Sequence, residues 1–135
     1  NYSKEDFAKK VLELTNGKGV SVVYDGVGKT TYDKSIECLK LRGTMVSFGN
    51  ASGPLDPIIV SKSLQPKGIY FVRPAMNQYF TNSAEIQEAA NMLFKQISSG
   101  NVKIEIYKKY KLEDAVQAHK DLEGRIITGP AVIIP

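Results

Sequence analysis

The apolar positions along the chain follow two alternating periodicities. Helical spacing recurs from Phe7 to Leu14 and from Ile86 to Ile97, which predicts helices with one apolar side. Between such stretches lie short apolar runs, such as Val20–Tyr24, that are typical of strands covered on both faces in a parallel sheet. The alternation of helices and strands therefore predicts an α/β fold with right-handed crossovers.

Turn-forming and capping residues set the limits of the predicted elements. Ser3 and Asp6 are expected to cap the first helix, and Asn16-Gly17 to end it. A second helix is expected from Thr30 or Thr31 to just before Arg42. The remaining predicted elements are strands at Val20–Tyr24, Thr44–Phe48, Ile69–Val72, Val102–Tyr107 and Ala131–Ile134, and helices at Ile58–Leu64, Ser83–Ser98 and Leu112–Leu122.

The hydrophobic pattern changes character after the longest predicted helix. Val102–Tyr107 alternates between apolar and polar residues, as a half-exposed strand does, whereas the earlier strands are almost continuously apolar. We therefore expect two domains, 1–78 and 79–135, with the second one built around a different sheet.

The segment Thr44–Pro54 combines a buried strand with a glycine-rich polar loop. In open α/β sheets, ligands bind in the crevice outside the carboxyl ends of the strands. The loop Gly49–Pro54 therefore predicts a small-molecule site, and a nucleotide is the expected ligand.

No complete phosphate-binding motif accompanies this loop. Gly28-Lys29-Thr30 resembles the end of a P-loop, but Val23 stands where that motif needs its first glycine. Gly26-Val27-Gly28 resembles the start of a dinucleotide fingerprint, but Thr31 replaces the third small residue. The glycines predict a strand-to-helix turn that could lie over a bound cofactor.

Composition narrows the possible functions. The apolar content of 42% and the charged content of 24% are those of a globular protein, and no apolar run is long enough to span a membrane. The single cysteine, Cys38, excludes an internal disulfide, and with one histidine, His119, it excludes an ordinary zinc site. We expect a cytoplasmic protein, and no set of residues suited to nucleophilic catalysis is evident.

The net charge of +4 is compatible with a phosphorylated cofactor or with nucleic acid. The densest basic cluster consists of Lys103, Lys108, Lys109 and Lys111. It lacks the interleaved aromatic residues of single-strand binders, which favours a solvated face.

Several stretches together resemble a known family. These are Asn1–Phe7, Leu14–Val20, Val23–Gly28, Val46–Gly53, Arg73-Pro74 and Leu122–Arg125. They occur in the order seen in NADPH-dependent quinone oxidoreductases, the zinc-free, zeta-crystallin-like branch of the medium-chain dehydrogenase/reductase superfamily. The resemblance extends from the first residue to the last, although the family's chain is more than twice as long.

The resemblance implies a partial Rossmann-type doubly wound parallel sheet, followed by the carboxyl-terminal strand–helix–strand piece of a GroES-like catalytic domain. It implies a hydride transfer from NADPH to a quinone or a related conjugated carbonyl. Because the family's amino-terminal domain and glycine-rich pyrophosphate loop have no counterpart here, we expect a fragment that is inactive alone. No catalytic residue and no metal ligand are expected within it.

The resemblance also assigns cofactor contacts. Tyr2 and Arg125 are expected near the adenosine 2′-phosphate, Val27 over the cofactor, Gly49–Pro54 beside the nicotinamide half and Phe71–Pro74 at its carboxamide end. The full set is Tyr2, Val27, Gly49, Asn50, Ala51, Ser52, Gly53, Pro54, Phe71, Val72, Arg73, Pro74 and Arg125.

The resemblance implies two partners, a quinone and a second copy of the chain that pairs along the edge strand Ile69–Val72. The need of an unpaired edge for cover agrees with the second of these. Three alternatives stay open: a dimerisation module without enzymatic activity, an RNA-binding module, and a structural remnant.

Overall fold

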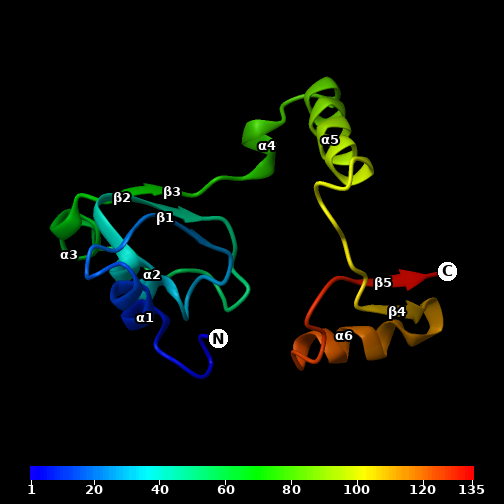
Figure 1. The fold of residues 1–135 in the computed structure, drawn as a ribbon, viewed down its shortest axis with the longest axis horizontal. Coiled ribbons are helices and arrows are strands. Elements are labelled where there is room, and N and C mark those ends of the chain that lie inside the picture. The colour runs from blue at the N-terminus through cyan, green and yellow to red at the C-terminus, as the bar shows by residue number, and fades with distance from the viewer. The chain divides into compact units, whose positions relative to one another are not determined.

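The computed structural model describes residues 1–135, which form two compact units, Asn1–Tyr79 and Phe80–Pro135. Figure 1 follows the chain through both units. None of the helices has the length and apolar character needed to cross a membrane.

The first unit is built on a three-stranded parallel sheet. Its strands β1 (Val20–Asp25), β2 (Leu39–Ser47) and β3 (Tyr70–Val72) lie in the order β1-β2-β3, with Tyr24 opposite Val46 and Val46 opposite Val72. Helix α2 (Tyr32–Cys38) connects the first two strands, and α3 (Val60–Ser63) with the 3₁₀ turn Gln65–Lys67 connects the last two. The predicted α/β fold with a parallel sheet is thus confirmed.

Helix α1 (Phe7–Leu14) precedes the sheet and packs against α2. The Asp6 carboxylate accepts hydrogen bonds from the Ala8 and Lys9 N–H groups, so it caps the helix as predicted, whereas Ser3 lies outside the cap. Asn16 and Gly17 follow with positive φ angles of 52° and 75°, the left-handed ending expected of these residue types.

The core of this unit lies on one face of the sheet. Leu39 and Met45 are fully buried there against Tyr32 and Ile36 of α2, together with Ile69. On the other face Tyr24 is 73% exposed and Tyr70 is 65% exposed. The crossover helix α2 packs on the face that carries Met45 and Phe71, so within residues 1–79 the predicted cover is found on that face.

Helix α2 ends earlier than its apolar pattern predicts, and β2 begins at Leu39 instead of Thr44. The Lys67 ammonium donates to the carbonyls of Ile36, Glu37 and Leu39, which satisfies the end of the helix at that point. The start of β2 is irregular, because the register jumps between the pairs Val20–Leu39 and Val22–Thr44 and Arg42 has a φ of 57°.

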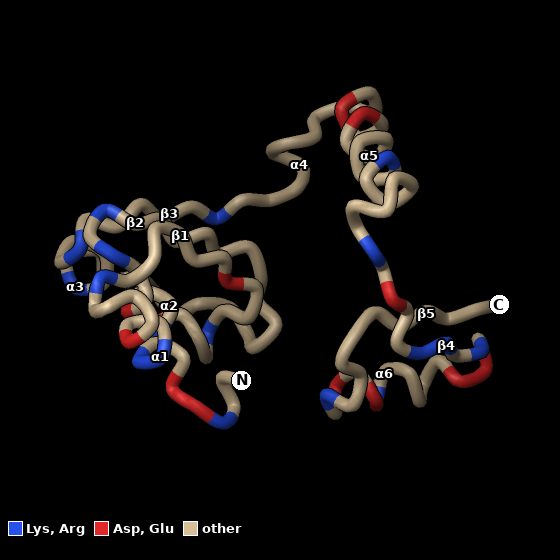
Figure 2. Tube along the Cα trace, viewed as in Figure 1, with Lys and Arg blue, Asp and Glu red and all other residues tan.

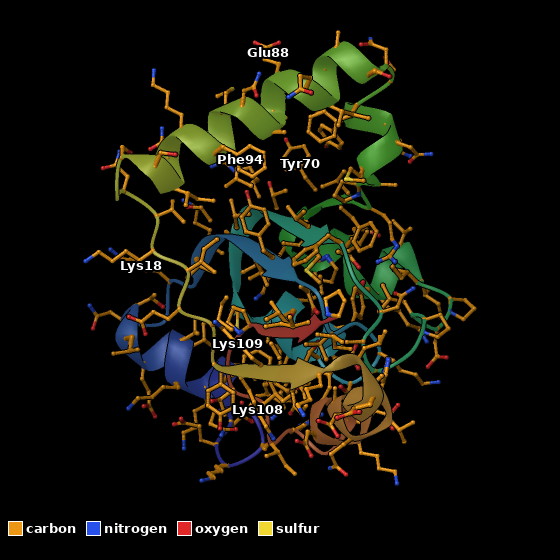
Figure 3. The ribbon with its side chains drawn as sticks, turned by 90° about the vertical axis from the view of Figure 1, so that its right-hand side faces the viewer. Lys18, Tyr70, Glu88, Phe94, Lys108 and Lys109 are labelled. Carbon is orange, nitrogen blue, oxygen red and sulfur yellow. The ribbon has the colours of Figure 1, made fainter.

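The first unit closes with the short helix α4 (Met76–Tyr79), which the hydrophobic pattern does not predict. In the second unit, α5 (Ser83–Ser98) has the predicted limits, and the Asn82 side chain caps it by accepting from the Glu85 N–H. A parallel pair, β4 (Lys108–Lys111) and β5 (Ala131–Ile134), is joined through the 3₁₀ turn Leu112–Asp114 and α6 (Ala115–Glu123). Figure 3 shows the consecutive residues Lys108 and Lys109 on opposite sides of β4.

The strand predicted at Val102–Tyr107 is wrong, since the ladder begins only at Lys108. A strand exists only where a neighbour supplies hydrogen bonds, and β5 is long enough to pair with Lys108–Lys111 alone. Tyr107 makes a single backbone bond to Pro130, which leads into this ladder.

Candidate functional site

The carboxyl ends of the three parallel strands bring three segments to one edge of the sheet. The turn Gly26–Thr31 follows β1, the loop Phe48–Pro54 follows β2, and Arg73-Pro74 follows β3. Parallel pairing puts these strand ends next to one another, which is the position where open α/β sheets bind ligands.

Backbone hydrogen bonds join the first two segments along their length. The Asp25 carbonyl accepts from the Phe48 N–H at 3.0 Å, and the Gly26 carbonyl accepts from the Ala51 N–H at 3.3 Å. The N–H of Lys29 donates in the other direction, to the Gly53 carbonyl at 3.3 Å. The turn and the loop therefore form two layers that are bonded to each other. We call these two layers the rim (residues 25–31 and 48–54).

Ser52 ties the rim together with its side chain as well as its backbone. Its N–H and its Oγ both donate to the Val27 carbonyl at 2.8 Å, and the same Oγ accepts from the Thr30 N–H at 3.0 Å. One small hydroxyl residue thus connects the loop to both sides of the turn.

The approach of the two layers requires glycine at two positions. A Cβ added to Gly49 would overlap the Gly26 carbonyl, so no side chain fits there. At Gly28 the φ angle is 90°, and an added Cβ would lie 2.9 Å from the Gly53 carbonyl oxygen. Backbone carbonyls and N–H groups therefore line the rim where side chains would otherwise stand.

A buried carboxylate underlies the rim. Asp25, the last residue of β1, is 4% exposed. Its Oδ1 accepts from the N–H groups of Val27 and Gly28 at 2.8 and 2.9 Å, and its Oδ2 accepts from the hydroxyls of Thr31 and Ser35, both at 2.8 Å.

Opposing influences set the acidity of this group. Burial raises the pKa of Asp25, but the hydrogen bonds from Gly28, Ser35, Thr31 and Val27 outweigh burial and leave the pKa below its ordinary value. The carboxylate is therefore ionised at neutral pH, and neutral donors alone satisfy it.

Arg73 fastens the third segment to the rim. Its Nη1 donates to the carbonyl and the hydroxyl of Ser47 at 2.9 and 3.1 Å, and to the Gly49 carbonyl at 3.3 Å. The cation that was expected at a cofactor's carboxamide thus has backbone partners at the start of the glycine-rich loop.

The structure gathers most of the predicted site residues at this edge but not all of them. Val27, Gly49–Pro54 and Phe71–Pro74 lie on the segments that meet there. Tyr2 is half-exposed in the segment before α1, and Arg125, with a φ of 57°, follows α6 in the second unit.

Sequence reasoning missed the polar residues under the rim. Asp25, Thr31 and Ser35 are all buried, and Ser47 at the end of β2 is 1% exposed. The signal that could have found them is an acidic residue ending an apolar strand, followed by hydroxyl residues in the next helix. Such a carboxylate needs buried donors close by in the chain.

The arrangement combines a backbone held by its own hydrogen bonds with one cation, Arg73, which is bonded to Ser47 and Gly49. The structure contains no group of three or more His, Cys, Asp or Glu side chains that could hold a metal ion. An edge of this kind suits the binding of a polar ligand.

Comparisons with known proteins agree with this geometry. A model of the family described as zinc-binding dehydrogenase matches residues 1–133. The chain belongs to this family. Within it, the chain is 44% identical to the quinone oxidoreductase of Salmonella typhimurium over 100% of its own length, and 43% identical to a 2-haloacrylate reductase of Burkholderia sp.

Solved structures of such dehydrogenases have the same fold. The Escherichia coli quinone oxidoreductase complexed with NADPH is 42% identical and superposes over 100% of the chain with a TM-score of 0.92. The 2-haloacrylate reductase structure, also 42% identical, gives a TM-score of 0.81. The resemblance to the quinone oxidoreductases and the expected enzyme family are thus confirmed.

The chain spans about two fifths of the relatives that it matches. It covers 42% of the Salmonella protein, 41% of the 2-haloacrylate reductase and 42% of the Escherichia coli structure.

Proposed function

We propose that this chain forms the nicotinamide-facing part of the cofactor site in an oxidoreductase that transfers a hydride from NADPH to a quinone or a related conjugated carbonyl. The observation that carries the proposal is the rim, in which two glycine-containing segments from neighbouring parallel strands are bonded together at the ligand-binding edge. A relative with this fold has been solved in complex with NADPH.

In this proposal the loop Gly49–Pro54 lies beside the nicotinamide half of NADPH, and Val27 covers the cofactor. The segment Phe71–Pro74 approaches the carboxamide end. Arg73 then acts on the cofactor through the loop, because its Nη1 donates to Ser47 and Gly49.

Tyr2 and Arg125 are the proposed contacts of the adenosine 2′-phosphate. Arginine suits a phosphate because its planar guanidinium donates two parallel hydrogen bonds. Their substitution should raise the dissociation constant for NADPH much more than that for NADH, which carries no 2′-phosphate. Equal effects on both cofactors would contradict these contacts.

A bound NADPH would supply the hydride chemistry. The residues of the chain bind and orient its nicotinamide ring, and none of them is proposed as an acid or a base. The hydrogen bonds within the rim hold its two segments in one conformation before the ligand binds, so little rearrangement is needed on binding.

The names of two relatives support the proposed substrate class. Proteins of nearly equal identity to the chain are named quinone oxidoreductase and 2-haloacrylate reductase, so a conjugated carbonyl is the shared chemistry. Oxidation of NADPH by the full-length protein should be followed with a benzoquinone and with 2-chloroacrylate. If the protein reduces neither compound, the proposed reaction is overturned.

Binding tests the cofactor assignment directly. NADPH fluorescence, titrated with the full-length protein, should saturate with a dissociation constant in the range typical of enzyme substrates, about 1 μM to 1 mM. Residues 1–135 alone should bind weakly or not at all, because the pyrophosphate loop expected in the family has no counterpart among them. Tight binding by this piece would contradict that part of the proposal.

We also propose that two copies pair through β3. This strand lies at an end of the sheet, and its residues Tyr70 and Val72 are exposed. A charge on an edge strand opposes such pairing. Val72→Lys should therefore lower the mass of the full-length protein in sedimentation, whereas Met92→Lys, at an exposed site on α5, should not.

An RNA-binding role finds less support. Figure 2 shows acidic residues beside the basic ones around α1, β4 and α6, so the basic residues form no continuous stripe along these elements.

A further inference from the structure

The two layers of the rim are connected through Asp25. The carboxylate lies on one side of the turn Gly26–Gly28, and the loop 49–54 lies on the other. Two peptide units of the turn stand between them, and each unit is bonded on both sides.

The first of these is the peptide unit between Gly26 and Val27. Its N–H, from Val27, donates to Asp25 Oδ1 at 2.8 Å, and its carbonyl, from Gly26, accepts from Ala51 at 3.3 Å. In a planar trans peptide the N–H and the C=O point in opposite directions. Fixing the N–H on the carboxylate therefore aims the carbonyl at the loop.

The second is the peptide unit between Val27 and Gly28, which repeats the arrangement. The Gly28 N–H donates to Asp25 Oδ1 at 2.9 Å, and the Val27 carbonyl accepts from the N–H and the Oγ of Ser52, both at 2.8 Å. Hydrogen bonds in such chains polarise one another, so an ionised acceptor at one end strengthens the bonds at the other.

The carboxylate is itself held in place from the opposite direction. Thr31, just before α2, and Ser35, within it, both donate to Asp25 Oδ2, and both residues are buried. Helix α2 thus fixes the carboxylate, the carboxylate fixes the two peptide units, and these fix the loop.

We propose that Asp25 is a positioning residue for the cofactor site, because its carboxylate holds two peptide units whose carbonyls set the conformation of the loop 49–54. This inference rests on the proposed function and adds to it the buried group on which the shape of the nicotinamide-facing loop depends. Asp25 does not touch the ligand.

The test uses three variants of the full-length protein. Asp25→Ala removes the acceptor altogether, and Asp25→Asn keeps an oxygen for the two N–H groups while losing the charge. Asp33→Asn is the matched control, since it removes the same charge from an exposed position on α2.

Hydrogen exchange without ligand measures the order of the loop. In Asp25→Ala the amides of Ala51 and Ser52 should exchange about tenfold faster, while those in the centre of β2 change less. Asp25→Asn should lie closer to the wild type, and Asp33→Asn should match it. Equal acceleration throughout β1, β2 and the loop would mean a general loss of stability and would overturn the inference.

Cofactor binding measures the consequence. If the binding-competent loop is populated one tenth as often, the dissociation constant for NADPH rises by about tenfold. The KM for NADPH should rise in parallel, while kcat at saturating NADPH stays within about twofold. Asp25→Asn should restore most of the affinity, and it also decides the question if Asp25→Ala does not fold.

The outcomes separate the two proposals. Failure of the wild-type protein to bind NADPH overturns the proposed function, and the inference falls with it. Wild-type binding that is unchanged in both Asp25 variants overturns the role of Asp25 alone.

Discussion

Gly49 and Gly26 lie against each other at the edge of the sheet, so closely that a single methyl group on Gly49 would overlap the Gly26 carbonyl. The contact joins the ends of β1 and β2, and it brings the two layers of the rim close enough for the Ala51 N–H to donate to the Gly26 carbonyl. Backbone approaches backbone here, and no side chain can move aside to relieve the overlap.

Gly49→Ala should therefore separate the two layers of the rim. Overpacking of this kind costs about 1–3 kcal/mol of the free energy of unfolding, to be measured by urea denaturation. The dissociation constant for NADPH should rise at the same time.

Gly100→Ala is the control for this substitution. Gly100 has a φ of 77°, and no atom lies near a Cβ added there. The Gly100→Ala protein should therefore lose about 1 kcal/mol of its free energy of unfolding through backbone strain and keep its NADPH affinity. A Gly49→Ala protein as stable as the wild type would show that the two layers separate without cost.

Arg73→Ala should loosen the same loop from the side of β3. It removes the donor to Ser47 and Gly49, and since Arg73 is exposed we expect a loss of only about 1 kcal/mol. The affinity for NADPH should fall, and Ser47→Ala, which removes one acceptor without changing Arg73, should lower it in the same direction. If Ser47→Ala leaves NADPH binding unchanged while Arg73→Ala abolishes it, Arg73 acts on the cofactor directly.

The edge of the sheet at which the turn and the loop meet was predictable from the sequence, because it depends on local features. Glycines follow apolar runs at Gly26–Gly28 and Gly49–Gly53, and parallel strands bring their carboxyl ends together whatever their length. For the same reason the long helix Ser83–Ser98 and the last strand Ala131–Ile134 have their predicted limits.

What the sequence does not reveal is which distant groups bond to one another. The role of Asp25 depends on the pairing of its turn with Ala51 and Ser52, which the register of β1 on β2 decides. Lys67 likewise donates to the carbonyls at the end of α2 from about thirty positions along the chain. The apolar pattern contains no sign of this contact, so it predicts a helix that is too long. The alternation at Val102–Tyr107 is a strand pattern without a neighbouring strand to pair with.

The ammonium of Lys67 gives a prediction about stability alone. Lys67→Met keeps the aliphatic chain but leaves the carbonyls of Ile36, Glu37 and Leu39 without their charged donor. A hydrogen bond to a charged group contributes about 1.5–3 kcal/mol, and partial exposure of Lys67 puts the expected loss at the lower end. Lys62→Met, at an exposed site on α3, should have little effect, and neither variant should change NADPH binding.

A buried network in the second unit gives a prediction about pH. Asp121 is 5% exposed and accepts from the Tyr110 hydroxyl at 2.6 Å, from the Lys108 ammonium at 2.9 Å and from Gln117 at 2.6 Å. These hydrogen bonds, that of Tyr110 foremost, lower the pKa of Asp121 to about 2.

Folding therefore favours the ionised form of Asp121, whose pKa in an unfolded chain is about 3.9. The stabilisation is fully present above that value and is lost as the pH falls from about 4 toward 2, since the unfolded chain then takes up a proton that the folded one resists. In thermal unfolding followed across this range, the wild-type midpoint should fall more steeply than that of Asp121→Asn. Tyr110→Phe keeps the carboxylate but removes its strongest donor, so the pKa of Asp121 should rise toward its unfolded value. The loss of stability should still begin near pH 4, but it should be smaller and complete at a higher pH than in the wild type. Parallel curves for the wild type and Asp121→Asn would show that the network contributes nothing to the acid sensitivity of the protein.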